Sequence, residues 1–423
     1  MAYFFFVLFF LFKWYGDHRN LHRVERRQRQ MCIRDSTYTE VTRRSWGSKL
    51  GGSIKGIFGG LVIAAIGVVL LWWNEGRAVT TARSLKEGAR DVVSVLAERV
   101  DAGNEGKPIH TSGEATTSET LVDPVCGVQV QAIALRRKVE MYQWQESSRS
   151  ETRKKLGGGE ETVTTYTYER AWVDKPIDSN DFKKPEGHTN PGSFPLDSET
   201  WRAATVTLGA FTLSPGLVSQ IGTFDPLPPP DPARVAIAPA RGRRAHLQGS
   251  YLYLGFDPGR PEVGDLRLSF AMVRPTTVSV VAQQTGGTLT AYQTKAGRAL
   301  QMLALGVRPA DAMFEAAEQS NTMLTWLLRL VGFVLLFVGL NALFRPFVVL
   351  GDVVPFIGNL LGKGTAAVSF LIAAVIALVV IALAWIAHRP LLGIGLLAVA
   401  AVALVLILTR RKKAGPPPLP SAA

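Results

Sequence analysis

The chain has 423 residues, of which 47% are hydrophobic, and its mean hydropathy is only +0.14. This value is too low for a typical transporter and too high for a plain soluble enzyme, so the apolar residues must be concentrated in parts of the chain. The net charge of +13 does not indicate a nucleic-acid partner, because most of the excess lysine and arginine lies beside apolar segments near the two ends. Cys32 and Cys126 lie on opposite sides of the first apolar span, which excludes a disulfide within the central part and a cysteine zinc site.

The amino-terminal segment, residues 1–36, stands apart from the rest. It begins with a phenylalanine-rich apolar run of signal-peptide length, but no small-residue cleavage site follows, and arginine-rich sequence comes next. The string from Arg29 to Ser36 resembles the read-through of a sequencing adapter. We therefore predict that this segment is non-native or disordered.

Four runs of about 18 to 20 largely apolar residues are long enough to cross the hydrocarbon core of a bilayer as helices. One lies near the amino end and three lie near the carboxyl end. The segment between the second and third runs, 345–364, is apolar but interrupted by prolines and glycines, so we expect an interfacial or re-entrant segment there. The predicted spans are 56–73, 323–344, 365–387 and 391–408.

Lysine and arginine in the short loops set the expected orientation. The segment 37–55 before the first span is basic, and so is the proline-rich tail 409–423 after the fourth span. We expect both in the cytoplasm. The central domain, 74–322, then lies on the opposite face of the membrane, in the periplasm, outside the cell or in an organelle lumen.

Small residues recur every four positions at the first span, at Gly52, Gly56, Gly60 and Ala64. Such a stripe allows close helix association, within the bundle or between subunits of a homo-oligomer. The alternative is the ordinary abundance of glycine and alanine in membrane helices. Arg329 is the one fixed charge well inside a predicted span, and we expect it to snorkel to the interface.

The central domain is predicted to be β-rich, in an α+β arrangement. Residues 139–145 and 163–172 alternate in character and are rich in Val, Thr, Tyr and Trp, and they flank a charged, glycine-rich stretch at 154–161. This pattern predicts a long hairpin. The proline-rich stretch 224–244 predicts an exposed loop or an internal boundary. Few helices are expected: one continuing from the first span and one starting at Pro309.

No motif for catalysis or metal binding stands out. His110, His188 and His246 are far apart and lack the spacing of zinc ligands. The chain has no nucleophile elbow, phosphate-binding loop or dinucleotide fingerprint. Carboxylates such as Glu262 and Asp265 could be paired by folding, but any domain of this size has such pairs. We predict a protein that is not an enzyme, with no catalytic residues, no cofactor and no metal.

Several short motifs occur in a fixed order along the chain. Together with one plus three spans, they resemble the transmembrane protein 43 (LUMA) family from about Ser45 to Lys413. The residues that carry the likeness include Asn74, Glu75, Gly76 and Arg77 at the exit of the first span, then Glu140, Tyr142 and Trp144, and finally Glu262, Gly264 and Asp265.

The resemblance implies a multipass protein whose eukaryotic relatives lie in the endoplasmic reticulum and inner nuclear membrane. Those relatives self-associate and help to organise envelope complexes with emerin and lamins. It implies no catalytic residues. The alanine-rich composition is typical of bacteria, which would place this chain in the plasma membrane. At the first motif, Glu75 and Arg77 could pair with each other or with neighbouring helices, or could simply anchor the helix end.

The function that we predict is that of a membrane scaffold. Its partners would be the lipid bilayer, a second copy in a homo-oligomer, and other membrane or envelope proteins. The alternative is a channel or transporter component, which needs polar residues along a path through the membrane. Arg329, Asn341 and Asn359 are the residues available for it.

Overall fold

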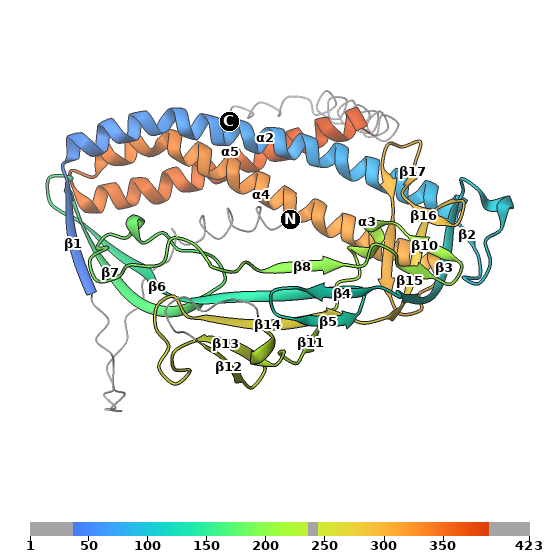
Figure 1. Cartoon of the computed structure of the whole chain (residues 1–423). Coiled ribbons are helices and arrows are strands. Elements are labelled where there is room, and N and C mark those ends of the chain that lie inside the picture. Colours follow the sequence, from blue (N-terminus) through green and yellow to red (C-terminus); the bar gives the residue numbers. More distant parts are fainter. Residues whose placement is uncertain (1–36, 236–243, 389–423) are drawn as a thin grey trace, which may run out of the picture.

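The computed structural model describes residues 37–235 and 244–388 (Figure 1). The predictions for residues 1–36, for the fourth span at 391–408 and for most of the tail therefore lie outside the described residues. Part of the proline-rich stretch 224–244 is also outside them.

Three long helices in the described part of the chain are each long and apolar enough to cross a membrane. The predicted spans 56–73, 323–344 and 365–387 lie within them, so the membrane-protein prediction is confirmed. Every helix is longer than the span predicted in it, and α2, with 46 residues, is about 70 Å long at about 1.5 Å per residue. The helices are α2 (Trp46–Asp91), α4 (Ala310–Gly351) and α5 (Pro355–His388).

The segment expected to be broken, 345–364, is mostly helical. Helix α4 continues through Pro346 to Gly351, and α5 starts at Pro355, so only three residues connect them. Proline removes one backbone donor and clashes with the preceding turn, but apolar sequence on both sides still allows the helix to continue. The two helices therefore form a hairpin with a tight turn.

The central part is β-rich, as predicted, and contains two large sheets. The first sheet has the order β1-β7-β6-β14-β13-β12, with β8 added to β6 and β11 added to β14. The pairs β6–β7, β6–β14 and β13–β14 are all antiparallel. The strands are β1 (Thr37–Arg44), β6 (Ala134–Lys154), β7 (Glu160–Val173), β8 (Glu199–Arg202), β11 (Asp225–Leu227), β12 (Arg244–Gln248), β13 (Tyr251–Gly255) and β14 (Leu266–Val273).

The second sheet has the order β19-β15-β16-β10-β9-β3-β2, and β15 also pairs with β3. Two small hairpins, β4-β5 and β17-β18, complete the strands, and the short helix α3 (Pro215–Val218) follows β10. The strands are β2 (Val93–Ser94), β3 (Pro108–Thr116), β4 (Thr120–Asp123), β5 (Val128–Gln131), β9 (Thr207–Leu208), β10 (Phe211–Leu213), β15 (Thr276–Thr285), β16 (Thr288–Thr290), β17 (Tyr292–Gln293), β18 (Ala299–Leu300) and β19 (Met302–Leu305).

Buried apolar side chains form a core against each sheet, and a further cluster of them joins the domain to the helices. One core includes Phe211 and Val278 of the second sheet, and another includes Val139 and Leu268 of the first. A third cluster packs Leu85 of α2 and Phe314 of α4 against Val281 and Leu300. The ends of α2 and α4 that extend past α5 thus form a stalk that docks on the second sheet (Figure 1).

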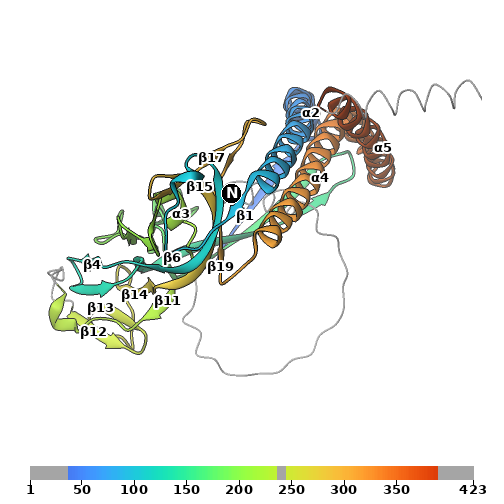
Figure 2. The ribbon, with the colours of Figure 1, turned by 90° about the vertical axis from the view of Figure 1, so that its right-hand side faces the viewer.

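The predicted hairpin is confirmed and extends far beyond the sheet. Strands β6 and β7 are paired to Lys154 and Glu160, and β1 adds a third strand beside β7. We call this extension the arm; it comprises residues 37–44 and 147–167, and its tip is the turn at 154–160. The arm runs beside the helices and reaches the end of the bundle where α2 begins (Figures 1 and 2).

The tip of the arm contacts the turn between α4 and α5. The Gly157 N–H donates to the Val353 carbonyl at 3.3 Å, and the Lys154 ammonium lies 2.7 Å from the Asp352 carboxylate. The β6–β7 hairpin and the segment 37–55 are expected from the sequence on opposite faces of the membrane, but the structure pairs β7 with β1 of that segment. No local signal in the polar residues of β1 indicated a strand partner more than a hundred residues away.

Candidate functional site

Helices α2 and α4 approach each other most closely through small residues. A Cβ added at Gly60 would lie 2.7 Å from the Gly339 carbonyl oxygen, and one at Gly67 would lie 2.9 Å from the Gly332 carbonyl oxygen. Ala64 is buried in the same contact. Glycine is required here because the two backbones leave no room for a side chain.

Only half of the predicted small-residue stripe lies in this contact. Gly60 and Ala64 face α4, whereas a Cβ at Gly52 or Gly56 would meet nothing within 4 Å. Gly67 also lies in this contact, outside the predicted stripe. Its counterparts on α4 are Gly332 and Gly339, whose seven-residue spacing matches that of Gly60 and Gly67. This shared spacing of small residues in two spans is the sequence signal for the contact.

A buried ion pair connects α2 to α4 beside these glycines. The Arg329 guanidinium donates from Nε and Nη2 to the two carboxylate oxygens of Glu75, at 2.6 and 2.8 Å. The indole N–H of Trp385 on α5 donates to the same carboxylate at 2.8 Å. Glu75 is only 2% exposed, so this one carboxylate holds all three helices together.

Arg329 therefore does not snorkel freely to the interface. Its guanidinium carbon lies 4.7 Å from the ring centroid of Trp326 and 5.8 Å from that of Trp385. Aromatic faces and a bidentate carboxylate are the surroundings that make a buried arginine tolerable. Its partner could have been suspected from the sequence, because Glu75 and Arg329 stand near matching ends of two apolar spans.

The neighbouring motif residues make a second set of contacts between α2 and α4. Arg77 donates to the side-chain oxygens of Asn74, Asn321 and Thr325, and its bonds to Asn321 and Thr325 are both 2.9 Å long. Asn74 is fully buried, and its amide donates to the Thr325 carbonyl at 3.1 Å. Arg77 thus pairs with neutral groups of the neighbouring helix rather than with Glu75.

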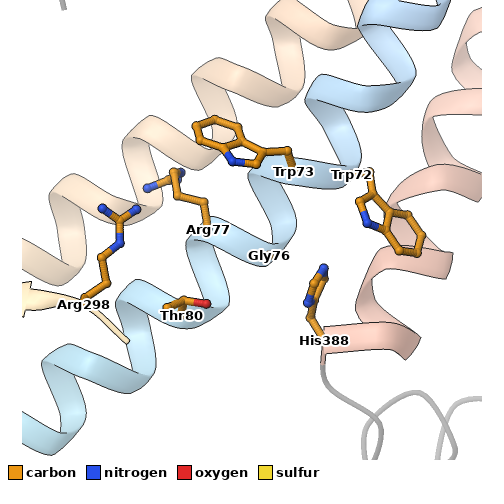
Figure 3. A pocket seen from close by; sticks show the side chains of 7 residues that line it. All are labelled: Trp72, Trp73, Gly76, Arg77, Thr80, Arg298 and His388. Atoms are coloured by element: carbon orange, nitrogen blue, oxygen red, sulfur yellow. The ribbon is translucent and has the colours of Figure 1, made fainter. Parts of the chain in front are cut away.

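A shallow cavity of about 390 Å³ opens beside this network (Figure 3). Gly76 separates Arg77 and Arg298 on one side from Trp72 and His388 on the other. A Cβ at Gly76 would lie 2.9 Å from the imidazole of His388, so glycine allows α5 to end against α2. The motif residues Asn74, Glu75, Gly76 and Arg77 therefore all serve the packing of the three helices.

The remaining motif residues are brought together at the base of the arm. The Gly264 N–H donates to the Tyr142 carbonyl at 2.9 Å, and the Tyr142 N–H donates to the Asp265 carbonyl at 2.8 Å. Gly264 has a φ of +93°, in the region that favours glycine. Arg267 donates to Glu140 at 2.7 Å, so the loop before β14 is fixed to β6.

Asp265 is fully buried and organises this loop. Its carboxylate accepts the Tyr253 hydroxyl at 2.5 Å and the Glu262 N–H at 2.8 Å. Burial, followed by the neighbouring Asp265 carboxylate, raises the pKa of Tyr253 well above its usual range. Hydrogen bonds from Arg267 and Lys138 hold the pKa of Glu140 below its usual value, although burial opposes this. The Asp265 and Glu140 carboxylates therefore fix the loop before β14 to the neighbouring strands β13 and β6.

An alternating ladder of aromatic and basic side chains covers the same region. Arg267 lies over Trp172 at 5.0 Å, and Arg170 lies over Trp144 at 5.2 Å. Trp144 meets His188 edge-on, with 4.8 Å between the ring centroids. Such stacks stiffen the point where the arm leaves the sheet.

The three histidines of the central domain are spread over separate places. His188 lies in the aromatic ladder, His110 is 2.8 Å from the Arg308 carbonyl, and His246 is on β12. Among residues 37–235 and 244–388, no three His, Cys, Asp or Glu side chains are grouped as metal ligands. The prediction that the chain is not an enzyme stays a prediction.

Known proteins resemble most of the chain. Residues 141–390 match the family model described as "Transmembrane protein 43". "Transmembrane protein 43" of Homo sapiens is 35% identical over 379 residues, which cover 86% of this chain and 92% of the relative. The protein of that name from Rattus norvegicus is 34% identical over 375 residues, with the same coverage, and a homolog from Drosophila melanogaster is 34% identical over 346 residues, covering 80% and 90%. No solved structure matches the chain.

Proposed function

Since the chain belongs to the transmembrane protein 43 family, we propose that it is a multipass membrane scaffold. It self-associates and organises other membrane proteins through its β-rich domain, which lies outside the cytoplasm except for the tip of the arm. In a bacterium it would lie in the plasma membrane, and in a eukaryote in the endoplasmic reticulum and inner nuclear membrane. The fourth span, which lies outside the described residues, belongs to this proposal.

The arm is the observation that carries the proposal of self-association. Seven of the eight residues of β1 are exposed, and β1 is an edge strand, so one of its backbone edges has no partner strand in the described part of the chain. Its side chains are Thr, Tyr, Glu, Val and Arg. Hydrocarbon cannot form hydrogen bonds with the Thr, Glu and Arg side chains or with the unpaired backbone groups, each of which costs several kcal/mol there. A polar strand beside membrane-spanning helices therefore needs a protein or aqueous neighbour, which a second copy of the arm supplies.

The alternative of a channel or transporter component gains little from the helices. Of the three polar residues available for a path, Arg329 is held by Glu75. Asn359 accepts a hydrogen bond from Lys154 at 2.9 Å, at the tip of the arm. Arg329 thus joins α4 to α2, and Asn359 joins α5 to the arm, so both side chains already serve packing contacts.

A pair of matched variants tests self-association. Val41 on β1 is 51% exposed, and Leu247 on β12, an edge strand remote from the helices, is 56% exposed. In the full-length protein, Val41→Asp places like charges opposite each other where two arms meet, and we expect a smaller complex by native mass spectrometry and by cross-linking in membranes. Leu247→Asp should leave the complex intact. A wild-type protein that is monomeric in membranes, or an unchanged Val41→Asp complex, would contradict the proposal.

The placement of the domain is tested by thiol labelling of intact cells with a reagent that does not cross membranes. Cys32 and Cys126 are first replaced by serine. Single cysteines are then introduced by Leu247→Cys in the domain and by Leu156→Cys at the tip of the arm, where Leu156 is 89% exposed. We expect labelling of the first variant in intact cells and of the second only after permeabilisation. Labelling of both only after permeabilisation would place the domain in the cytoplasm. Labelling of both in intact cells would show that the domain and the start of α2 share one face.

A further inference from the structure

A larger cavity, of about 740 Å³, lies at the opposite end of the bundle from Glu75. Its walls come from the tip of the arm, the first turns of α2 and the last turns of α4. None of the family-motif residues lies in it. It is thus separate from the network around Glu75 and Arg77.

The cavity has a surplus of positive charge. Two acidic side chains face it, and both are held by lysines: Asp352 lies 2.8 Å from Lys49 and 2.7 Å from Lys154, and Glu160 lies 3.4 Å from Lys49. Further basic side chains complete the rim, and they are Arg44, Lys55 and Arg345.

The start of α2 adds to this positive potential. No acidic residue occurs in its first turn, and Ser48 and Lys49 of that turn line the cavity, so the positive end of the helix dipole lies beside it. The opposing carbonyl end of α4 is partly satisfied, because the Trp46 indole donates to the Val349 carbonyl at 2.8 Å. An anion entering here meets fixed donors and little competing negative charge.

One wall of the cavity is bare of side chains. Gly51, Gly52 and Gly56 line it, and a Cβ at any of them would meet nothing within 4 Å. The same stretch of α2 begins the apolar span, where Ile54 is 50% exposed and Phe58 is 75% exposed. A flat glycine surface beside exposed apolar side chains suits a hydrocarbon chain.

We propose that this cavity binds an anionic phospholipid. The phosphate contacts the basic rim formed by Arg44 and Lys55, and one acyl chain lies along the glycine wall of α2. Basic pockets at the interfacial ends of membrane helices favour anionic headgroups. The glycine wall and the adjoining apolar residues select a lipid over a free phosphate, since a soluble phosphate ester gains nothing from them.

The test compares lipid retention by full-length variants in detergent, using native mass spectrometry with phosphatidylglycerol or phosphatidylcholine as the added lipid. Arg44→Gln combined with Lys55→Gln should weaken phosphatidylglycerol binding about thirtyfold, because two basic side chains are removed from a charged surface. Arg149→Gln combined with Arg153→Gln, which removes the same charge from exposed positions on the arm, should leave it unchanged. Equal weakening by both pairs, or by neither, overturns the proposal.

A second pair of variants separates the lipid from a free phosphate. Gly52→Leu fills the glycine wall and should reduce phosphatidylglycerol retention, whereas Gly59→Leu, at an equally open glycine outside the cavity, should not. Soluble glycerol phosphate should compete at least a hundredfold less well than the lipid. Equal competition by glycerol phosphate, or no effect of Gly52→Leu, refutes a lipid as the occupant. Both glycine variants keep the basic rim, so a folded protein with reduced retention reports on the acyl chain.

Discussion

Removing the carboxylate that joins the three helices should destabilise the whole bundle. In Glu75→Gln the side chain keeps its size, but Arg329 loses both charge-assisted hydrogen bonds, at 2.6 and 2.8 Å, and Trp385 loses a charged acceptor. The side chain of Arg329 is only 15% exposed and that of Glu75 only 2%. The arginine charge would therefore stay largely buried without a counter-ion.

The expected loss is large because the free arginine cannot be solvated in place. Removing one partner of a buried pair typically costs about 3 to 5 kcal/mol. At about 2 to 4 °C per kcal/mol, this corresponds to a fall in Tm of roughly 6 to 20 °C. Replacing both partners, in Glu75→Gln with Arg329→Gln, leaves no unpaired charge, so this double variant should be more stable than Glu75→Gln alone.

The measurement is thermal unfolding of the full-length protein in one detergent, followed by intrinsic tryptophan fluorescence. Glu98→Gln, at an exposed position of the domain, is the matched control and should shift Tm by no more than the error. A Tm of Glu75→Gln within 2 °C of the wild type, by the scale above, would refute the claim that this pair holds the helices together. If the loss of stability in the double variant equals the sum of the losses in the two single variants, the two residues act independently.

Three further predictions concern other parts of the molecule. Gly339→Ala places a Cβ 2.6 Å from backbone atoms of α2 and should lower Tm, whereas Gly56→Ala, in open space, should leave it unchanged or raise it slightly. Hydrogen bonds from Arg267 and Lys138 lower the pKa of Glu140 in the folded protein. The contribution of Glu140 to the stability of the fold is therefore complete above the unfolded pKa of about 4.3, and it is lost as the pH falls through the lower pKa of the folded state. The wild type should therefore lose more stability on acidification than Glu140→Gln, as measured by Tm between pH 7 and pH 3. Burial, and then a nearby carboxylate, raises the pKa of the Cys126 thiol to about 12, so in a Cys32→Ser background iodoacetamide at pH 8 should label it only after denaturation, as mass spectrometry will show.

Hydropathy and alternation predicted the elements whose signals are local. A helix that crosses lipid must be a long apolar run, so α2, α4 and α5 were visible in the sequence. The long hairpin was visible because alternating strands flank the glycines at 157–159. The exact ends were not visible, since the polar turns that extend α2 to Asp91 are stabilised by packing on the second sheet.

Pairings between distant segments could not be predicted in the same way. Residues 37–44 belong to the segment 37–55, which the sequence predicts only to be basic and cytoplasmic, because polar residues such as Thr and Arg do not indicate a strand until β7 supplies a hydrogen-bonding edge. The partner of Arg329 is 254 positions away, and the only sequence signal that connects the two residues is complementary charge near matching ends of two spans. The division of the glycine stripe depends on where α4 crosses α2, which no residue of α2 specifies alone.

The two polar clusters of the bundle and the arm form one mechanical connection. At the Glu75 end, α2 and α4 continue as the stalk, which packs on the second sheet through Leu85 and Phe314. At the other end, Lys49 and Lys154 join the same two helices to the arm, which returns to the first sheet. The domain therefore contacts the helices at two places, Lys49 and Leu85, which lie about 54 Å apart along α2 at about 1.5 Å per residue. A tilt of the helices relative to the domain would have to break one of these two sets of contacts, so together they fix the orientation of the helices on the domain.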